Sequence, residues 1–304
     1  MGQTDAAFDG YRAALADAGL LIPSGVPGVY GWSGAFEDVV ERVDRYVTRM
    51  GADARAEVIR FPPVLRRADY ERTGHIDALP HLVGSVHSFV GTDREHRQLL
   101  QLREAGADWT TALRPTDLVL TPAACYPLYP SAAGRLPESG RTVDLGSFVF
   151  RHEPSPDPTR LTMFRMREYV RLGTPAQALR HRDDWIARAQ QMLAALGLDA
   201  RPVLANDPFF GRGGRALATL QREDSLKYEL VVPIVSDDAP TAVASSNYHL
   251  DHFSRPFGIT TPDGRLAHTA CVGFGLERVT LALFRAHGVH LGCWPAAVRR
   301  TLWP

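Results

Sequence analysis

Residues 161–172 alternate between apolar and polar side chains with a period of two, which predicts a β-strand whose two faces differ. One face is mostly apolar but holds a single carboxylate, and the other carries three arginines. The first face consists of Thr162, Phe164, Met166, Glu168 and Val170, and the arginines are Arg165, Arg167 and Arg171. Upstream, residues 148–150 suit a strand and 154–158 hold three prolines, so 148–173 predicts a hairpin. An edge hairpin with solvated arginines is an equally good interpretation of this stretch alone.

The same periodicities predict the other elements. Helical spacing indicates helices over 1–20, from 34 through Val47 and over 176–198, and residues 273–278 open a helix that continues to about 286. Alternating or β-branched runs indicate strands over 56–61, 118–129 (ending in a turn), 143–153, 201–205, 229–234, 241–248 and 266–272. Residues 22–31 are rich in Pro and Gly and predict a loop. Residues 209–227 predict a short apolar helix after a Gly-rich opening, which lacks the lysine of a phosphate-binding P-loop.

Composition narrows the class of protein. The 304 residues are 45% hydrophobic and 22% charged, which is ordinary for one globular domain, so we expect a single domain over 1–304. Formal net charge is zero, from 34 basic and 34 acidic residues, and this argues against a nucleic-acid partner. No apolar run approaches roughly 18 residues, so no membrane span is expected. The polar N-terminus and three unpaired cysteines favour the reducing cytoplasm.

Candidate chemistry gathers on the predicted hairpin. Glu168 lies on an apolar face, where a carboxylate costs free energy unless a cation or hydrogen-bond donors meet it. The first strand ends in Arg151-His152-Glu153. A guanidinium suits phosphate, and a Glu can accept a hydrogen bond from an exocyclic amine.

These residues also carry a family resemblance. FRHE (150–153), a loop and RLTMFRMREYVRLG (160–173) resemble motif 2 of class II aminoacyl-tRNA synthetases. The resemblance implies that Arg151 holds the α-phosphate of ATP, that Glu153 meets the adenine amino group and that Phe164 stacks on the ring. GFGLER (273–278) is similar to motif 3, whose Arg, here Arg278, stacks against the other side of the ATP. The helix from residue 34 with the strand ending at Pro62 resembles motif 1, which builds the homodimer interface.

The resemblance sets the expected fold and metal chemistry. It implies an α+β fold, in which an antiparallel sheet is flanked by helices, and a reaction that uses ATP and Mg²⁺. Cys125, Glu168 and Cys271 match, in order and motif context, the Cys/Glu/Cys zinc site of archaeal-type seryl-tRNA synthetases. Two thiolates and a carboxylate suit Zn²⁺ and leave its fourth position open. The alternative is two core cysteines and a partnered Glu168. The cluster His249, Asp251 and His252 matches no common metal spacing and is read as a hydrogen-bonded turn.

Within the superfamily, the chain resembles the amino acid:[carrier protein] ligases. Motif 1 begins near residue 36, which leaves no room for the tRNA-binding domain of archaeal-type seryl enzymes. The resemblance implies activation of glycine or alanine with ATP and transfer to the phosphopantetheine thiol of an acidic carrier protein, without tRNA. The extra helix that docks the carrier is expected in 209–227, where Arg212, Arg215 and Arg222 lie close together.

One position departs from the pattern. Seryl enzymes carry an acidic residue shortly before a Ser-Asn pair, but this chain has Thr241 there, so Glu229 alone is expected to assist Mg²⁺. No general base for the transfer step is identified. Two alternatives remain: a truncated seryl-type synthetase that acts on tRNA, and a catalytically silent paralogue that regulates a partner. The sequence does not choose glycine over alanine, since one methyl group is worth only about 1–3 kcal/mol in a pocket.

Overall fold

The computed structural model describes residues 3–236 and 238–304, without the side chains of 3–6, 212–214, 216, 217 and 220. The strands are β1 Leu21–Pro23, β2 Tyr30–Trp32, β3 Glu57–Ile59, β4 Val64–Arg66, β5 Ser85–Ser88, β6 Arg114–Leu120, β7 Gly134–Arg135, β8 Arg141–Phe150, β9 Met163–Gly173, β10 Arg201–Leu204, β11 Lys227–Val232, β12 Thr241–Leu250, β13 Ile259–Thr260 and β14 His268–Gly275. The helices are α1 Gln3–Asp17, α2 Gly34–Met50, α3 Arg67–Arg72, α4 His75–Ala78, α5 Asp93–Glu104, α6 Leu128–Ser131, α7 Pro175–Ala195, α8 Gly211–Glu223, α9 Ser254–Phe257, α10 Leu276–His287 and α11 Ala296–Leu302, with short 3-10 turns between them.

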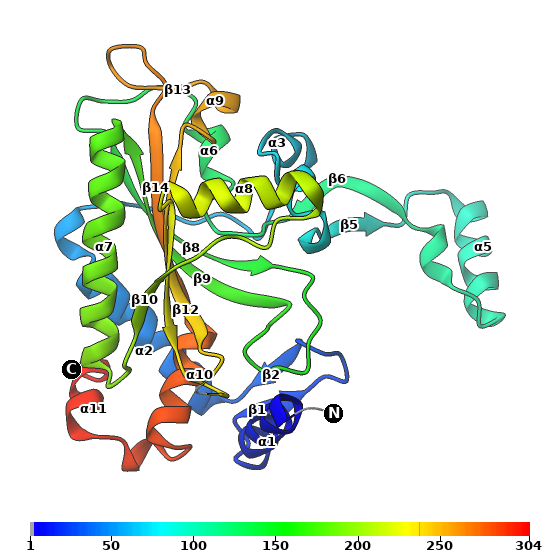
Figure 1. The fold of residues 1–304 in the computed structure, drawn as a ribbon. Helices are drawn as coiled ribbons and strands as arrows, with labels where there is room; N and C mark the ends of the chain where they lie inside the picture. The colour runs from blue at the N-terminus through cyan, green and yellow to red at the C-terminus, as the bar shows by residue number, and fades with distance from the viewer. Residues whose placement is uncertain (1–2, 237) are drawn as a thin grey trace.

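The centre of the fold is a seven-stranded sheet of order β10-β11-β12-β14-β9-β8-β3 (Figure 1). Each neighbouring pair is antiparallel except β3 and β8, which run parallel at one edge. Helices α2, α7 and α10 cover one face of this sheet. The expected α+β fold, an antiparallel sheet flanked by helices, is confirmed.

Local sequence explains the two long helices on that face. Ser33 caps α2, and Thr174 caps α7 in a capping box with Gln177 while Pro175 takes the first helical turn. Their apolar stripes bury Val39, Val43, Trp185, Met192 and other residues in the larger core cluster. No helix in the described part of the chain is long and apolar enough to cross a membrane.

Antiparallel register separates the two faces of the sheet residue by residue. Tyr169 pairs with Val272, and both point into the core beneath the helices. Their neighbours Glu168, Val170 and Cys271 therefore point to the opposite face. A second, smaller core covers part of that face, and the rest holds the polar residues discussed below.

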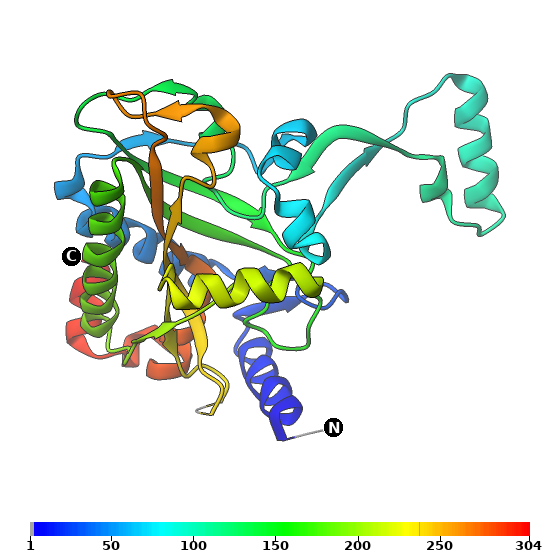
Figure 2. The ribbon, with the colours of Figure 1, turned by 45° about the horizontal axis from the view of Figure 1, so that its top comes forward.

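An arm extends from the body between β5 and β6 (Figure 2). It carries α5, which begins with a capping box formed by Thr92 and Glu95 and buries none of its residues. The arm grows from the small sheet of order β4-β6-β5. The sequence pattern predicts no element over residues 64–117, where the structure has β4, β5, β6 and several short helices. It also reads residues 22–31 as a loop, whereas β1 and β2 pair there as a short hairpin.

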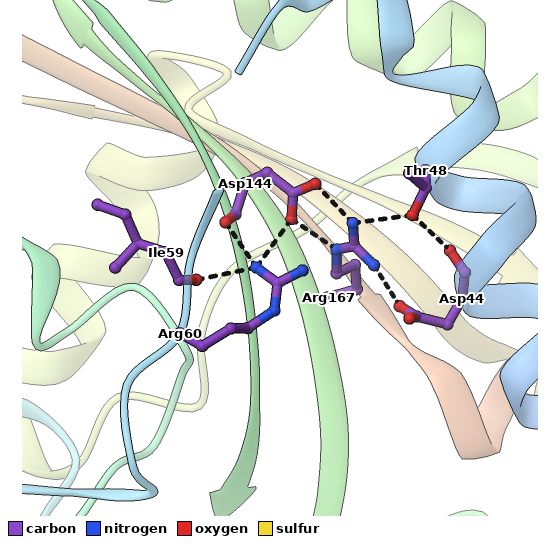
Figure 3. Close-up of polar contacts among 6 residues, drawn as sticks. All are labelled: Asp44, Thr48, Ile59, Arg60, Asp144 and Arg167. Carbon is purple, nitrogen blue, oxygen red and sulfur yellow. Dashed lines mark hydrogen bonds and ion pairs between the residues drawn. The ribbon is translucent and has the colours of Figure 1, made fainter. Parts of the chain in front are cut away.

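The surroundings of the β9 arginines contradict one of the two interpretations of residues 148–173. The hairpin of β8 and β9 lies inside the sheet, and Arg165 and Arg167 pair with carboxylates, while Arg171 donates to Thr142 and to the Ser139 carbonyl. An edge hairpin with solvated arginines is therefore wrong. Arg167 is 4% exposed and donates from Nε and Nη2 to the two carboxylate oxygens of Asp144, at 2.7 and 2.5 Å. Its Nη1 reaches Asp44 on α2 at 2.5 Å, and Arg60 joins Asp144 from the other side (Figure 3). The buried pair of Asp144 on β8 and Arg167 on β9, extended to the partly exposed Asp44 on α2, thus ties the helix to the sheet.

We expect Asp144→Asn to lower the free energy of unfolding by about 3–5 kcal/mol, because it leaves the buried Arg167 without its bidentate partner. Urea unfolding followed by circular dichroism measures the loss. The control is Glu41→Gln, whose ion pair with Arg45 is more than half exposed on both sides and should cost less than about 1 kcal/mol. Equal losses in the two variants would contradict a buried network that holds α2 to the sheet.

Candidate active site

Four strands, β11, β12, β14 and β9, present polar or small residues on the face of the sheet opposite the long helices. Register aligns Glu229 with Ser245, Ser245 with Gly273, and Gly273 with Glu168. One step along, it aligns Lys227, Asn247, Cys271 and Val170 in the same way. Because residues directly opposite one another in a ladder share a face, these side chains form one continuous surface. Residues that are far apart in the sequence meet here.

Two guanidinium groups lie close to the Phe164 ring. The guanidinium carbon of Arg151 is 5.8 Å from the centroid of the Phe164 ring, and that of Arg278 is 5.9 Å from it. Backbone carbonyls hold both arginines: Arg151 Nε donates to Pro122 O at 3.0 Å, and Arg278 Nε donates to Thr159 O at 2.8 Å. The three residues expected at a nucleotide are thus brought together.

The charges around Phe164 favour the binding of an anion. Burial lowers the pKa of Arg278 to about 10, and the positive charges of Arg151 and Arg160 add to the effect. Glu153 lies nearby and accepts from Arg160 at 3.3 Å. Two guanidinium groups that repel each other beside an aromatic ring gain free energy when a negatively charged group binds close to both.

Cys125, Glu168 and Cys271 also meet, although they come from different segments. The Cys125 thiol is within hydrogen-bonding reach of both the Cys271 sulfur and the Glu168 carboxylate. Donation from Cys125 holds the pKa of Cys271 well below its ordinary value, and the same bond, burial and the Glu168 charge raise the pKa of Cys125. Burial raises the pKa of Glu168 to about 8. Ala124 N donates to Glu168 Oε1 at 3.1 Å, but Oε2 is buried without a hydrogen-bond partner.

As they stand, these side chains form a hydrogen-bonded cluster. Among the described residues, no group of three or more His, Cys, Asp and Glu side chains is arranged to hold a metal ion. The convergence of the three is compatible with both interpretations of the sequence, zinc ligands or buried cysteines beside a partnered Glu168. The donor set itself fits Zn²⁺, and the unpartnered Oε2 leaves one strong ligand atom unused.

Asn247 and His249 adjoin this cluster, and the sequence pattern does not predict these contacts. Asn247 Nδ2 donates to Cys271 Sγ at 3.5 Å, and His249 Nε2 lies 3.5 Å from the same sulfur. His249 also contacts Thr269 through Nδ1 at 3.0 Å, and its carbonyl accepts from His252 N at 3.1 Å, so this segment is the hydrogen-bonded turn that the sequence predicts. The cross-strand pairing of Asn247 with Cys271 is the signal that could have found Asn247.

The Glu229 carboxylate is paired with a lysine, unlike a carboxylate that only binds a metal ion. Its Oε1 lies 3.0 Å from Nζ of Lys227, a buried ammonium that also donates to Asp207 at 2.6 Å. Asp207 in turn exchanges two hydrogen bonds with Gln221 of α8, at 2.7 and 2.8 Å. The chain Glu229, Lys227, Asp207, Gln221 therefore joins the polar face to the last turns of α8.

Helix α8 runs from the sheet toward the small β4-β6-β5 sheet (Figures 1 and 2). It confirms the helix expected in 209–227 and contacts α4. Arg215 and Arg222 are exposed and lie seven residues apart, which places them on one side of the helix. The side chain of Arg212 is outside the described residues.

Two glycines of the polar face are not required by the fold. Neither Gly273 nor Gly275 has a positive φ, and a Cβ on Gly273 would come no closer than 3.5 Å to Glu168 and 3.8 Å to Met166. A Cβ on Gly275 would come no closer than 3.7 Å to Arg278. These are ordinary contact distances. Glycine inside a strand costs stability, so its use here indicates a surface that a ligand approaches closely.

Comparison with known proteins gives a consistent result. No family model matches the chain. It is 47% identical to "Amino acid--[acyl-carrier-protein] ligase 2" of Bradyrhizobium diazoefficiens over 290 residues, which are 95% of this chain and 86% of that protein. Ligase 1 of the same organism is 46% identical over 95% of this chain and 88% of its own length. The "Type-2 serine--tRNA ligase" of Methanococcus maripaludis is 29% identical over 62% of this chain and 39% of that protein.

Solved structures agree on the fold. The chain of M. kandleri SerRS in a complex with A. aeolicus tRNASec superposes with a TM-score of 0.81 at 21% identity, covering 97% of this chain and 60% of that one. Seryl-tRNA synthetase of Pyrococcus horikoshii complexed with ATP gives 0.69 at 15% identity, covering 91% of this chain and 58% of that one. The catalytic fold is therefore that of class II synthetases. With such identity to both Bradyrhizobium proteins over 95% of its length, the chain belongs to the amino acid–[acyl-carrier-protein] ligases.

Proposed function

We propose that this ligase activates a small amino acid, glycine or alanine, with ATP and passes it to the phosphopantetheine thiol of an acidic carrier protein. The observation that carries the ATP step is the Phe164 ring with the guanidinium groups of Arg151 and Arg278 close to it. Stacking on an aromatic ring is worth about 1–3 kcal/mol per base, and two guanidinium groups supply the charge that phosphates require. The similarity to two carrier-protein ligases supports the acceptor.

The first step forms the aminoacyl adenylate. The carboxylate of the amino acid attacks the α-phosphorus, a P–O bond to the β-phosphate breaks, and pyrophosphate leaves. Arg151 would neutralise the α-phosphate, Arg278 would stack on the nucleotide, and Glu153 would accept from the adenine amino group. Positioning and charge neutralisation account for the catalysis. In the second step the thiol sulfur attacks the carbonyl carbon, AMP leaves, and a thioester forms.

Magnesium would accompany ATP and spread the phosphate charge. Glu229 is the acidic residue proposed to assist it, since Thr241 occupies the other expected position. The fit of Glu229 is weak, because Lys227 lies 3.0 Å from its carboxylate and competes with a second cation. We therefore derive no step through Glu229.

Zinc is proposed at Cys125, Glu168 and Cys271, and its support is the convergence of the three side chains with the unpartnered Glu168 Oε2. When bound there, the ion would take the substrate amino group at its open position. The protein's own part is to leave room beside Glu168, because Gly273 lies opposite it with no side chain. We also propose that the chain is one catalytic domain over 1–304, that it acts as a homodimer through α2 and β3, and that it works in the cytoplasm.

The first prediction concerns ATP. We expect Arg278→Ala to abolish amino acid-dependent pyrophosphate exchange, because it removes the nucleotide's stacking cation. Gly273→Ala should lower the exchange rate while raising the free energy of unfolding by roughly 0.5–1 kcal/mol, since its Cβ fits the fold but projects into the substrate surface. Exchange is measured with glycine, alanine and serine, and stability by urea unfolding. Normal exchange by Arg278→Ala would contradict the ATP assignment. No exchange with any amino acid by the wild type would favour a silent paralogue.

The second prediction concerns zinc. Elemental analysis of the purified protein should find about one zinc per chain. Cys271→Ala should lose it, because one thiolate ligand is gone. Cys293→Ala is the matched control and should keep it, since Cys293 is exposed and far from the cluster in sequence. Equal zinc in the wild type and Cys271→Ala, or none in either, would contradict the triad.

The third prediction concerns the carrier. Arg215 and Arg222 present positive charge on one side of α8, which suits a carrier that is acidic around its phosphopantetheine serine. Reversing both to Glu should impair aminoacylation of the carrier, most strongly at low salt, and spare pyrophosphate exchange. Intact-protein mass spectrometry of the carrier measures the transfer.

The control for the carrier experiment reverses Arg299 and Arg300, which are exposed on α11, away from α8 (Figure 1). This variant changes the net charge equally and should transfer normally. Unchanged transfer by the α8 variant would place docking elsewhere, and loss of both activities would make the segment structural. Efficient charging of tRNA would favour a truncated seryl-type synthetase.

A further inference from the structure

Arg165 makes an ionic clamp that the proposed mechanism does not use. Its Nη1 and Nη2 donate to both carboxylate oxygens of Glu37 on α2, at 2.6 and 2.9 Å. Its Nε and its backbone N donate to the two carboxylate oxygens of Glu277 on α10, at 2.7 and 2.8 Å. One residue of β9 therefore ties together the helices of the sequence segments that resemble motifs 1 and 3.

The backbone bond to Glu277 replaces a missing strand. The ladder between β9 and β14 ends where Met166 pairs with Gly275, so Arg165 and Phe164 lie beyond it. On its other side, β9 continues to pair with β8 as far as Met163. The N–H of Arg165 thus meets a carboxylate at the point where the chain of β14 has turned into α10. Glu277 secures the end of the strand that carries Phe164.

Both members of the clamp are next to nucleotide residues. Arg165 follows Phe164, and Glu277 precedes Arg278, whose guanidinium lies over the Phe164 ring at 5.9 Å. We propose that Arg165 is a positioning residue for adenylate formation, which, through Glu277, fixes Phe164 and Arg278 relative to each other at the adenine. The proposal rests on the proposed ATP site.

Burial of Glu277 makes its ion pair with Arg165 hard to replace. The Glu277 side chain is 2% exposed, and burial raises its pKa while Arg165 opposes that change. Arg165 cannot turn away without leaving a buried carboxylate unpaired. A lysine at this position would keep the charge but lose the fork that reaches Glu37 and Glu277 together.

Arg167 provides a matched control within the same strand. It lies two residues on, faces the same helices, and also pairs with one carboxylate on α2 and one deeper in the fold, Asp44 and Asp144. It is more deeply buried than Arg165, at 4% against 22% exposure of the side chain. Neither of its carboxylate partners is next to a residue proposed at the nucleotide. Replacing Arg165 and replacing Arg167 should therefore differ more in their effect on the use of ATP than in their effect on stability.

The experiment compares Arg165→Lys, Glu277→Gln and Arg167→Lys in amino acid-dependent pyrophosphate exchange, with thermal unfolding in parallel. We expect Arg165→Lys and Glu277→Gln to raise KM for ATP about tenfold or more while KM for the amino acid changes less than about twofold. Arg167→Lys should lower Tm at least as much, yet leave KM for ATP within about twofold of the wild type.

Three results would overturn the positioning role: an unchanged KM for ATP in both clamp variants, an equal rise of KM for ATP in Arg167→Lys, or failure of both clamp variants to fold. Failure to fold would assign the pair to stability alone. Arg278→Ala separates this inference from the proposed function. If Arg278→Ala is inactive and the clamp variants are normal, only the positioning role fails; if Arg278→Ala exchanges normally, the ATP site itself is wrong.

Discussion

Antiparallel pairing of β9 with β14 is the constraint on which the rest of the structure depends. Side chains alternate along both strands, so a shift of one residue would exchange the two faces of the sheet. In the observed register Arg165 and Arg167 of β9 pair with carboxylates under the helices, while Phe164, Glu168 and Cys271 share the other face. A register shifted by one residue would move the guanidinium groups away from their carboxylate partners and turn Phe164, Glu168 and Cys271 toward the helices. Because burying unpaired charges costs free energy, the observed register is strongly favoured.

The same alternation explains what could be predicted from the sequence. The two faces of β9 and the parity of Cys271 with Gly273 are visible in the residue order, because period-two patterns are local. The convergence of Cys125 with Glu168 is not, because 42 residues and a change of strand separate them; only the family resemblance suggested it. The carboxylate partner of Arg165 is hidden in the sequence for the same reason, since Glu277 lies 112 positions away and no local rule links the two.

Other misses have different physical causes. Strands β1 and β2 have three residues each, too few for a periodic pattern. Helix α5 has a readable start at Thr92 and Glu95, but its apolar residues form no buried stripe, so the usual signal of an amphipathic helix is weak. The contact of His249 with Cys271 depends on a shift in register near Leu250, which sequence spacing does not reveal.

The exposed arm has a consequence for how the molecule responds to change. Since α5 shares no core with the seven-stranded sheet, its backbone can open without disturbing any buried contact of the catalytic face. Its amides should therefore exchange with solvent hydrogen far sooner than those of β9 or β14. Mutations that would be purged elsewhere can accumulate in it, which leaves this segment free to diverge while the sheet beneath it stays fixed.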